Sequence, residues 1–185
     1  DENVGVTETN NVVQDLTYVA ILKDYGPKAD CTIAKPKGYT PAEFDGACTD
    51  FYQNKQLKAP TVDGKKMLDY GRIPHGKYMI NWPNQGNDTY LNLVELKPAA
   101  REAALVKAKE TTLRFVYFIQ TQLGFRNLGL ADDEFETPDR LAWMPYYREG
   151  RRVQGLVRMN IRHIAEPFTY ADPLYRTGIA VGDYP

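Results

Sequence analysis

The sequence predicts an α+β fold in which a mixed or antiparallel sheet accompanies one long helix at about residues 98–123, with long irregular loops between the elements. Short runs of β-branched and aromatic residues suit strands. One long stretch keeps apolar residues at helical spacing. Frequent glycines and prolines between residues 28 and 71 leave no room for long elements. Because no repeat or clear linker is visible, we expect residues 1–185 to form a single α+β domain.

The first expected strand covers residues 12–23, VVQDLTYVAILK, and should be largely buried. Turn-forming residues end it at 24–27. Residues 28–71 are expected to be extended loops with short strands. A connection of this length is unusual in a compact domain, so we expect it to be functional or to pack on another part of the protein.

A second strand is expected at residues 76–82, GKYMINW, followed by a polar loop. The long helix begins with Pro98, which suits a first-turn position, and Gly124 suits its C-terminal cap. Its second half, LRFVYFIQ, is apolar nearly all round. This end of the helix should therefore be buried on more than one side.

Two further strands are expected, at residues 140–147 and 153–164. In the second, apolar and polar residues alternate, which predicts one face on a core and the other on solvent, a cofactor or a neighbouring domain. His163 ends this strand on its apolar face and is expected to be buried and hydrogen bonded. The polar face comprises Arg152, Gln154, Arg158, Asn160 and Arg162.

The composition suits one domain with a real core, because 43% of the 185 residues are hydrophobic. With 23 basic and 24 acidic side chains the net charge is −1, which argues against bulk electrostatic binding of nucleic acid or of an anionic membrane. No apolar run approaches the ~20 residues that cross a bilayer. The first ten residues, DENVGVTETN, have neither the basic nor the apolar part of a signal peptide.

The sequence contains two cysteines and two histidines. Cys31 and Cys48 form no CxxC motif, so a disulfide and two separate thiols both remain open. The absence of serine excludes a Ser-His-Asp mechanism. His75 lies among turn formers, where it would act as a general base or have a structural role. His75 and His163 lack a fitting carboxylate pattern, so we expect no metal site.

The sharpest cluster is formed by Arg148, Arg151 and Arg152 within residues 145–155, PYYREGRRVQG. Guanidinium groups bind carboxylates and phosphates through paired hydrogen bonds. They would hold an anionic substrate or stabilise negative charge that develops during a reaction. The alternative is a solvated turn that pairs with the acidic residues 132–136, themselves expected to be a solvated face. Tyr147 would add a hydroxyl beside the arginines or fill the core.

An aromatic ring and many amide groups occur together in residues 81–88, NWPNQGND. Sugars are bound in this way, with their CH faces on Trp82 and their hydroxyls held by Asn84 and Asp88. The same composition also makes ordinary turns, because Asn and Asp bond to their own backbone.

Several segments carry a resemblance to a known family. They are REGRRVQG at 148–155, VGDYP at 181–185, PHGKYMINWPNQGND at 74–88 and VVQDLTYVAILKDYG at 12–26. The chain resembles FAD-dependent oxidoreductases, whose members are often labelled putative xanthan lyase. The resemblance covers most of the chain and is strongest from about residue 72 to residue 185. The Asp and His residues that normally follow the last segment are absent.

The resemblance implies a substrate-binding or cap domain, a piece of a larger flavoprotein whose FAD-binding domain is the missing partner. FAD would belong to the intact protein and would not be held by this piece alone, which contains no GxGxxG motif. The implied reaction is hydride transfer to flavin from a polar, carbohydrate-like or anionic small molecule, in a periplasmic or secreted protein. Its implied residues are Arg148 and His75 in catalysis, Arg151, Arg152, Trp82, Asn84, Asp88 and Tyr147 at the substrate, and Tyr184 and Pro185 at the cofactor.

Three other functions remain open. A non-catalytic carbohydrate-binding module would use Trp82 and the tyrosines as a platform. A domain associated with a polysaccharide (xanthan) lyase would use arginine with histidine or tyrosine. An interaction domain would dock its arginine face to another subunit.

Overall fold

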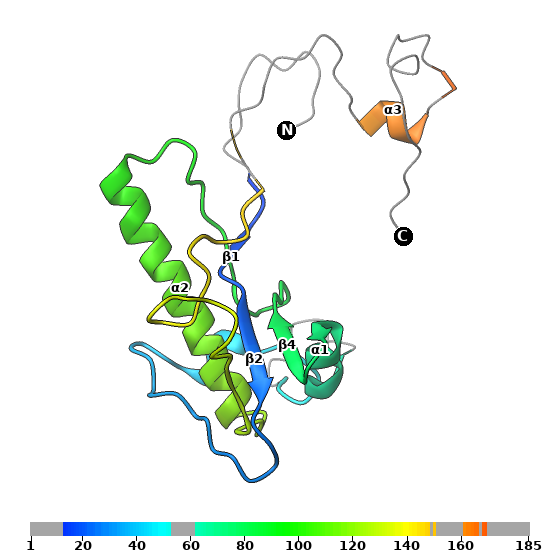
Figure 1. The fold of residues 1–185 in the computed structure, drawn as a ribbon. Helices are drawn as coiled ribbons and strands as arrows, with labels where there is room; N and C mark the ends of the chain where they lie inside the picture. The colour runs from blue at the N-terminus through cyan, green and yellow to red at the C-terminus, as the bar shows by residue number, and fades with distance from the viewer. Residues whose placement is uncertain (1–12, 53–61, 149, 151–160, 167, 170–185) are drawn as a thin grey trace. The chain divides into compact units, whose positions relative to one another are not determined.

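The computed structural model describes residues 13–52, 62–148, 150, 161–166 and 168–169. By its internal contacts the chain divides into two compact units, residues 14–149 and residues 1–13 with 150–185. Figure 1 shows the described elements of both units. In the second of these units the described element is the short helix α3 (Ile161–Ala165). All other helices and strands among the described residues belong to residues 14–149.

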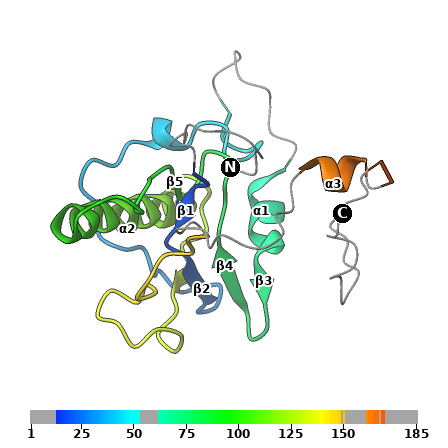
Figure 2. The same ribbon diagram turned by 90° about the horizontal axis from the view of Figure 1, so that it is seen from above.

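The larger unit contains a four-stranded antiparallel sheet in the order β3-β4-β2-β6. Strand β2 pairs with both of its neighbours: Ala20 lies opposite Ile80 of β4, and Leu22 lies opposite Leu130 of β6. The strands β3, β4 and β2 lie side by side in Figure 2. The antiparallel arrangement confirms the predicted α+β fold. The strands are β2 (Ala20–Asp24), β3 (Arg72–Ile73), β4 (Lys77–Ile80) and β6 (Leu128–Leu130).

A second, smaller sheet joins the start of the unit to the segment after β4. It consists of β1 (Leu16–Thr17) and β5 (Asp88–Thr89), which pair antiparallel. The predicted strand at 12–23 is thus two short strands, β1 and β2, separated by Tyr18 and Val19. This break allows one segment to serve two different sheets.

The long helix α2 (Pro98–Thr121) confirms the helix predicted at 98–123. Pro98 stands in its first turn as expected. Gly124 follows with a φ of 82°, a left-handed conformation that glycine adopts at no steric cost. The C-terminal half contains Phe115, Val116, Phe118 and Ile119, all fully buried. The prediction that this end is buried on more than one side is confirmed.

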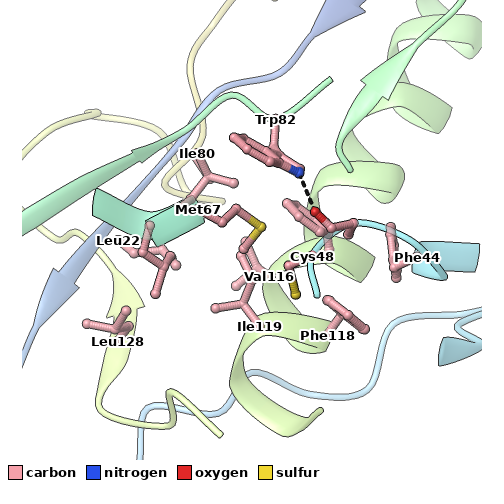
Figure 3. Close-up of a cluster of buried hydrophobic side chains, with 14 of the residues drawn as sticks. Leu22, Phe44, Cys48, Met67, Ile80, Trp82, Val116, Phe118, Ile119 and Leu128 are labelled. Atoms are coloured by element: carbon pink, nitrogen blue, oxygen red, sulfur yellow. Dashed lines mark hydrogen bonds between the residues drawn. The ribbon is translucent and has the colours of Figure 1, made fainter. Parts of the chain in front are cut away.

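The main core lies between this half of α2 and the four-stranded sheet, as Figure 3 shows. Three elements that come between β2 and β4 in the sequence close it on the remaining side. They are the 3-10 helix η1 (Pro41–Phe44), the bridge between Cys48 and Phe51, and the helix α1 (Gly64–Tyr70). The buried side chains include Leu22, Phe44, Cys48, Met67, Ile80, Trp82, Val116, Phe118, Ile119 and Leu128.

The helix α1 corrects the prediction that residues 28–71 are loops with short strands. The Asp63 carboxylate caps its start by accepting a hydrogen bond of 2.7 Å from the Lys66 backbone N–H. Met67 and Leu68 then point into the core. Two core contacts per short helix are too few for a periodic pattern to stand out in the sequence.

Two predicted strands are also corrected. Residues 140–147 form bends and irregular chain with one bridge, between Tyr146 and Thr17, because Arg140 adopts a φ of 55° and Trp143 is exposed. Of the strand predicted at 153–164, residues 153–160 lie outside the described residues, and the remainder belongs to the helix α3. His163 is buried in α3, with 5% exposure, as its apolar position predicted.

Both cysteines, Cys31 and Cys48, are free thiols, which settles the alternative that the sequence left open. Burial raises the pKa of the Cys48 thiol. None of the helices in the described part of the chain has both the length and the apolar character needed to cross a membrane.

Candidate functional site

The candidate site is built around Thr17, whose backbone is paired on both sides. Thr17 lies opposite Asp88 in the register of β1 and β5. On its other side the Thr17 N–H donates to the Tyr146 carbonyl at 3.1 Å, and the Tyr146 N–H donates to the Thr17 carbonyl at 2.7 Å. Side chains of directly opposed residues point to the same face of a sheet. Asp88, Thr17 and Tyr146 therefore stand next to one another on one face.

Arg148 and Asp15 extend this face. Side chains two positions apart share a face of an extended chain, which places Arg148 with Tyr146 and Asp15 with Thr17. The Arg148 guanidinium stacks on the Tyr146 ring, 5.0 Å from its centroid. Both Arg148 and Asp15 act electrostatically on the Asp88 carboxyl. These five residues (Asp15, Thr17, Asp88, Tyr146 and Arg148) are called the polar row below.

The Asp88 carboxyl has the most perturbed environment of the polar row. Burial raises its pKa above the ordinary value, and the nearby charge of Asp15 adds to the increase. The hydroxyl of Thr17, which donates to Asp88 Oδ1, and the charge of Arg148 act in the opposite direction. Among the described residues Arg148 forms no direct salt bridge with Asp88, although their charges interact. The two side chains therefore interact through their charges without direct contact.

The opposite face of the same strands is apolar and packs on α2. Leu16, Tyr18, Leu93 and Ala108 form a second buried cluster there. Tyr147, which was predicted to bind substrate, packs against this cluster. Its hydroxyl accepts a hydrogen bond of 3.2 Å from the Leu93 N–H. In the structure Tyr147 therefore holds the loop before α2, on the face away from the polar row.

The side chain of Asn87 positions Asp88, its neighbour. Asn87 is fully buried, and its Oδ1 accepts from the Trp82 N–H at 2.9 Å. Its Nδ2 donates to the carbonyls of Ile80 at 3.0 Å and Tyr18 at 3.2 Å. One amide group thereby connects the end of β4, the break between β1 and β2, and the start of β5. Because this one side chain satisfies three buried backbone groups, it holds the three segments in fixed positions.

Trp82 and Asn84, predicted with Asp88 to bind substrate, lie apart from the polar row. The Trp82 ring is 8% exposed, and its Nε1–H donates to the Ala47 carbonyl at 2.8 Å (Figure 3). Stacking on a sugar would require this ring to leave the core. Asn84 is exposed in the turn that follows. That turn needs Gly86, because a Cβ there would lie 2.2 Å from the Trp82 carbonyl oxygen.

His75, predicted as a catalytic residue, is exposed at the turn between β3 and β4, with a φ of 64°. Its neighbour Gly76 accepts a hydrogen bond of 2.9 Å from the Asp24 N–H, at the end of β2 farthest from Thr17. Asp24 lies seven positions after Thr17 in the sequence, which corresponds to about 20 Å where the chain is extended. The structure does not bring His75 to Arg148. The other predicted residues, Arg151, Arg152, Tyr184 and Pro185, lie outside the described residues.

The acidic run at 132–136 pairs with lysines. Lys23 lies 2.9 Å from Asp132 and 3.3 Å from Asp133, and Lys77 lies 3.0 Å from Asp133 and 2.5 Å from Glu134. These hydrogen bonds lower the pKa of Asp132 and Asp133 and raise that of Lys77. Within the part of the chain that is described, the run does not pair with Arg148.

The start of α1 does not fit the pyrophosphate of a dinucleotide. Such a group needs free N–H donors at the N-terminus of a helix. At the start of α1 the Gly64 N–H donates to the Asp50 carboxylate at 2.8 Å, and the Asp63 carboxylate caps the next turn. At the start of α2, Pro98 lacks an N–H, and no side chain caps this end of the helix. No group of three potential metal ligands occurs among the described residues.

Sequence reasoning identified Asp88 and Arg148 but missed the residues between them. Asp15 and Thr17 alternate with the apolar Leu16 and Tyr18, a pattern of period two. That alternation is the signal that could have marked a polar face within the segment predicted to be buried.

The family model described as FAD dependent oxidoreductase matches residues 4–185, nearly the whole chain. No curated protein and no solved structure was found to match. The match confirms the family expected from the sequence segments, and it gives FAD as the cofactor of the intact protein. On this match, the chain belongs to the family of FAD-dependent oxidoreductases.

Proposed function

We propose that residues 14–149 form the substrate-side part of an FAD-dependent oxidoreductase and that the polar row contacts the substrate. The substrate would be a polar, carbohydrate-like or anionic small molecule that gives a hydride to the flavin from a carbon bearing OH or NH. The observation that carries the proposal is that Asp88 and Arg148 lie on either side of Thr17 and that their charges interact without a direct salt bridge.

Four residues of the row have a role in this proposal. The Arg148 guanidinium is exposed, and its contact with the Tyr146 ring orients it for an anionic group. The partly buried Asp88 carboxyl accepts a hydrogen bond from the substrate and is held in place by Thr17. The predicted roles of Arg151 and Arg152 at the substrate, of His75 in proton transfer and of Tyr184 and Pro185 at the cofactor remain predictions.

We also propose that a separate domain holds the FAD. The carboxylates at the start of α1 support this proposal, because they would repel a pyrophosphate. An exposed apolar pair offers a contact surface for such a domain: Trp143 is 78% exposed and Met144 is 77% exposed. The loop that carries the pair is anchored by the buried Leu141 and by the salt bridge of 2.7 Å between Lys109 and Asp139.

The burial of Trp82 disfavours the alternative of a carbohydrate-binding module, which depended on this ring as a platform. The lyase-associated function depended on an arginine beside a histidine or tyrosine. Arg148 has Tyr146 beside it, with the guanidinium 5.0 Å from the centroid of the ring, so this alternative remains a prediction.

The test uses the protein isolated with its flavin from its natural source. Under anaerobic conditions, sugar acids, hydroxy acids and amino acids are added one at a time, and the yellow absorbance of the oxidised flavin is followed. We expect at least one polar or anionic compound to bleach it. A protein that carries no flavin, or a flavin that none of these compounds reduces, would contradict the proposed function.

A further inference from the structure

We infer that the polar row binds a small hydroxycarboxylate, with the carboxylate group on Arg148 and a hydroxyl group on Asp88. This inference rests on the proposed function and narrows its substrate class. It follows from the positions of the two charges, from their separation and from the hydrogen bonds already made by Thr17.

The backbone fixes the separation of the two groups. Asp88 and Tyr146 are both paired with Thr17, on opposite sides. Because paired strands lie about 4.8 Å apart, the backbones of Asp88 and Tyr146 are about 10 Å apart. The Arg148 guanidinium is held above the Tyr146 ring. A ligand of a few carbon atoms spans such a distance between its two end groups.

The charges of Arg148 and Asp88 determine which end of the ligand binds each residue. Arg148 is the one cation of the polar row and presents a planar fork of N–H donors, which matches a carboxylate. Asp88 accepts one hydrogen bond from Thr17 at Oδ1, and its other carboxylate oxygen can take a further donor. The ligand therefore needs an anionic end and, several bonds away, a hydrogen-bond donor.

The surroundings of Asp88 favour a neutral donor. The burial that raises the pKa of Asp88 also penalises any second charge brought beside it. A hydroxyl group supplies the hydrogen bond without that cost, whereas an ammonium group would lose its own hydration. Asp15, which is exposed, is the group of the row that an ammonium ligand would use instead.

The experiment compares four six-carbon probes by nuclear magnetic resonance on the full chain. Gluconate has both groups, sorbitol has only hydroxyls, hexanoate has only the carboxylate, and 6-aminohexanoate has an ammonium group in place of the hydroxyl. We expect gluconate to bind at least ten times more tightly than the other three and to shift the amide signals of Thr17, Asp88 and Arg148.

Variants show which residue binds the carboxylate group of gluconate and which binds its hydroxyl group. Arg148→Gln should remove the preference for gluconate over sorbitol, and Asp88→Ala should remove the preference for gluconate over hexanoate. Asp88→Asn, which keeps the shape of the side chain, should weaken gluconate less than Asp88→Ala does. Arg126→Gln is the matched control, because Arg126 is 58% exposed and bonds to Asp30 away from the row. It should leave all four affinities unchanged.

Four results would overturn the inference: tighter binding of 6-aminohexanoate than of gluconate, equal binding of gluconate and hexanoate, shifts confined to residues outside the row, or no binding of any probe. Reduction of the flavin by another compound, together with one of these results, would reject the hydroxycarboxylate and leave the proposed function standing. Tight binding of gluconate without any flavin reduction would reject the proposed function alone.

Discussion

Thr17 donates a hydrogen bond from its hydroxyl to the carboxylate of Asp88, the residue that lies opposite it in the small sheet. Thr17 is 1% exposed, whereas Asp88 is partly exposed. A buried donor thus fixes the direction of a carboxylate that remains accessible. This relationship makes Asp88 an oriented group and not a freely rotating surface acid.

Replacing Thr17 with valine should therefore change both the stability and the titration of Asp88. The donor is lost, so the pKa of Asp88 should rise further, and the free energy of unfolding should fall by about 1–2 kcal/mol. Denaturation in urea and carboxyl-carbon resonance titration measure the two effects. Thr32→Val is the control, because Thr32 makes the same bond to Asp30 at an exposed position. A pKa of Asp88 that does not move would show that the Thr17 bond is unimportant.

The raised pKa of Asp88 also predicts how stability depends on pH. The folded protein holds the Asp88 proton more tightly than the unfolded chain does, so the contribution of Asp88 to stability falls as the pH rises from the ordinary carboxyl pKa through the raised one. Asp88→Asn should remove this contribution. The free energy of unfolding of Asp88→Asn and of the parent protein is measured between the ordinary and the raised carboxyl pKa. As the pH rises through this interval, the variant should become more stable relative to the parent.

Asp132 and Asp133 should behave in the opposite way. Their pKa values are lowered by the hydrogen bonds to Lys23 and Lys77, so the stability they contribute is present above the ordinary carboxyl pKa and is lost as the pH falls through the lowered one. Comparing each variant with the parent at the same pH separates their effect from that of Asp88. A pH dependence of the same sign for Asp88→Asn and Asp133→Asn would contradict both assignments.

Asn87→Ala should destabilise the protein by about 2–4 kcal/mol, because it leaves the backbone groups of Trp82, Tyr18 and Ile80 without their buried partner. Asn84→Ala, three residues earlier and exposed, should change stability by less than about 0.5 kcal/mol. Urea denaturation of the two variants gives the comparison. Similar values for both would mean that the turn, and not the Asn87 side chain, holds this corner together.

Trp143→Ala tests the proposed contact with an FAD-binding domain. Since the ring is 78% exposed, the stability of residues 14–149 should stay nearly unchanged. Retention of the flavin by the intact protein should nevertheless weaken, and dilution followed by measurement of free flavin fluorescence detects this. Val106→Ala removes another exposed apolar side chain and serves as the control. Equal flavin retention in both variants would contradict the proposed surface.

Sequence patterns correctly predicted the elements that depend mainly on residues within the element itself. Pro98 and Gly124 delimit α2, and the apolar residues of its second half are indeed buried. The helix α1 was missed because its cap, Asp63, is followed by a single pair of core residues. Residues 140–147 were predicted to be a strand, but Trp143 and Met144 face solvent and only Tyr146 finds a partner strand.

The candidate site was predicted only in part for a related reason. Asp88 and Arg148 were identified by residue type and by family resemblance, which need no knowledge of contacts. Their common neighbour Thr17 lies 71 residues from Asp88 in the sequence, and no local pattern reports such a pairing. Trp82 shows the converse, since its amide-rich surroundings suggested a binding surface while the indole ring completes the core.

The most direct test of the central claim is the rate at which substrate reduces the flavin in an Arg148→Lys variant, measured by rapid mixing without oxygen. Lysine keeps the charge but cannot form the paired hydrogen bonds of a guanidinium, so we expect the rate to fall by ~100-fold or more. Arg126→Lys, the exposed control, should react like the parent protein. A rate for Arg148→Lys within about twofold of the parent would show that the polar row does not contact the substrate.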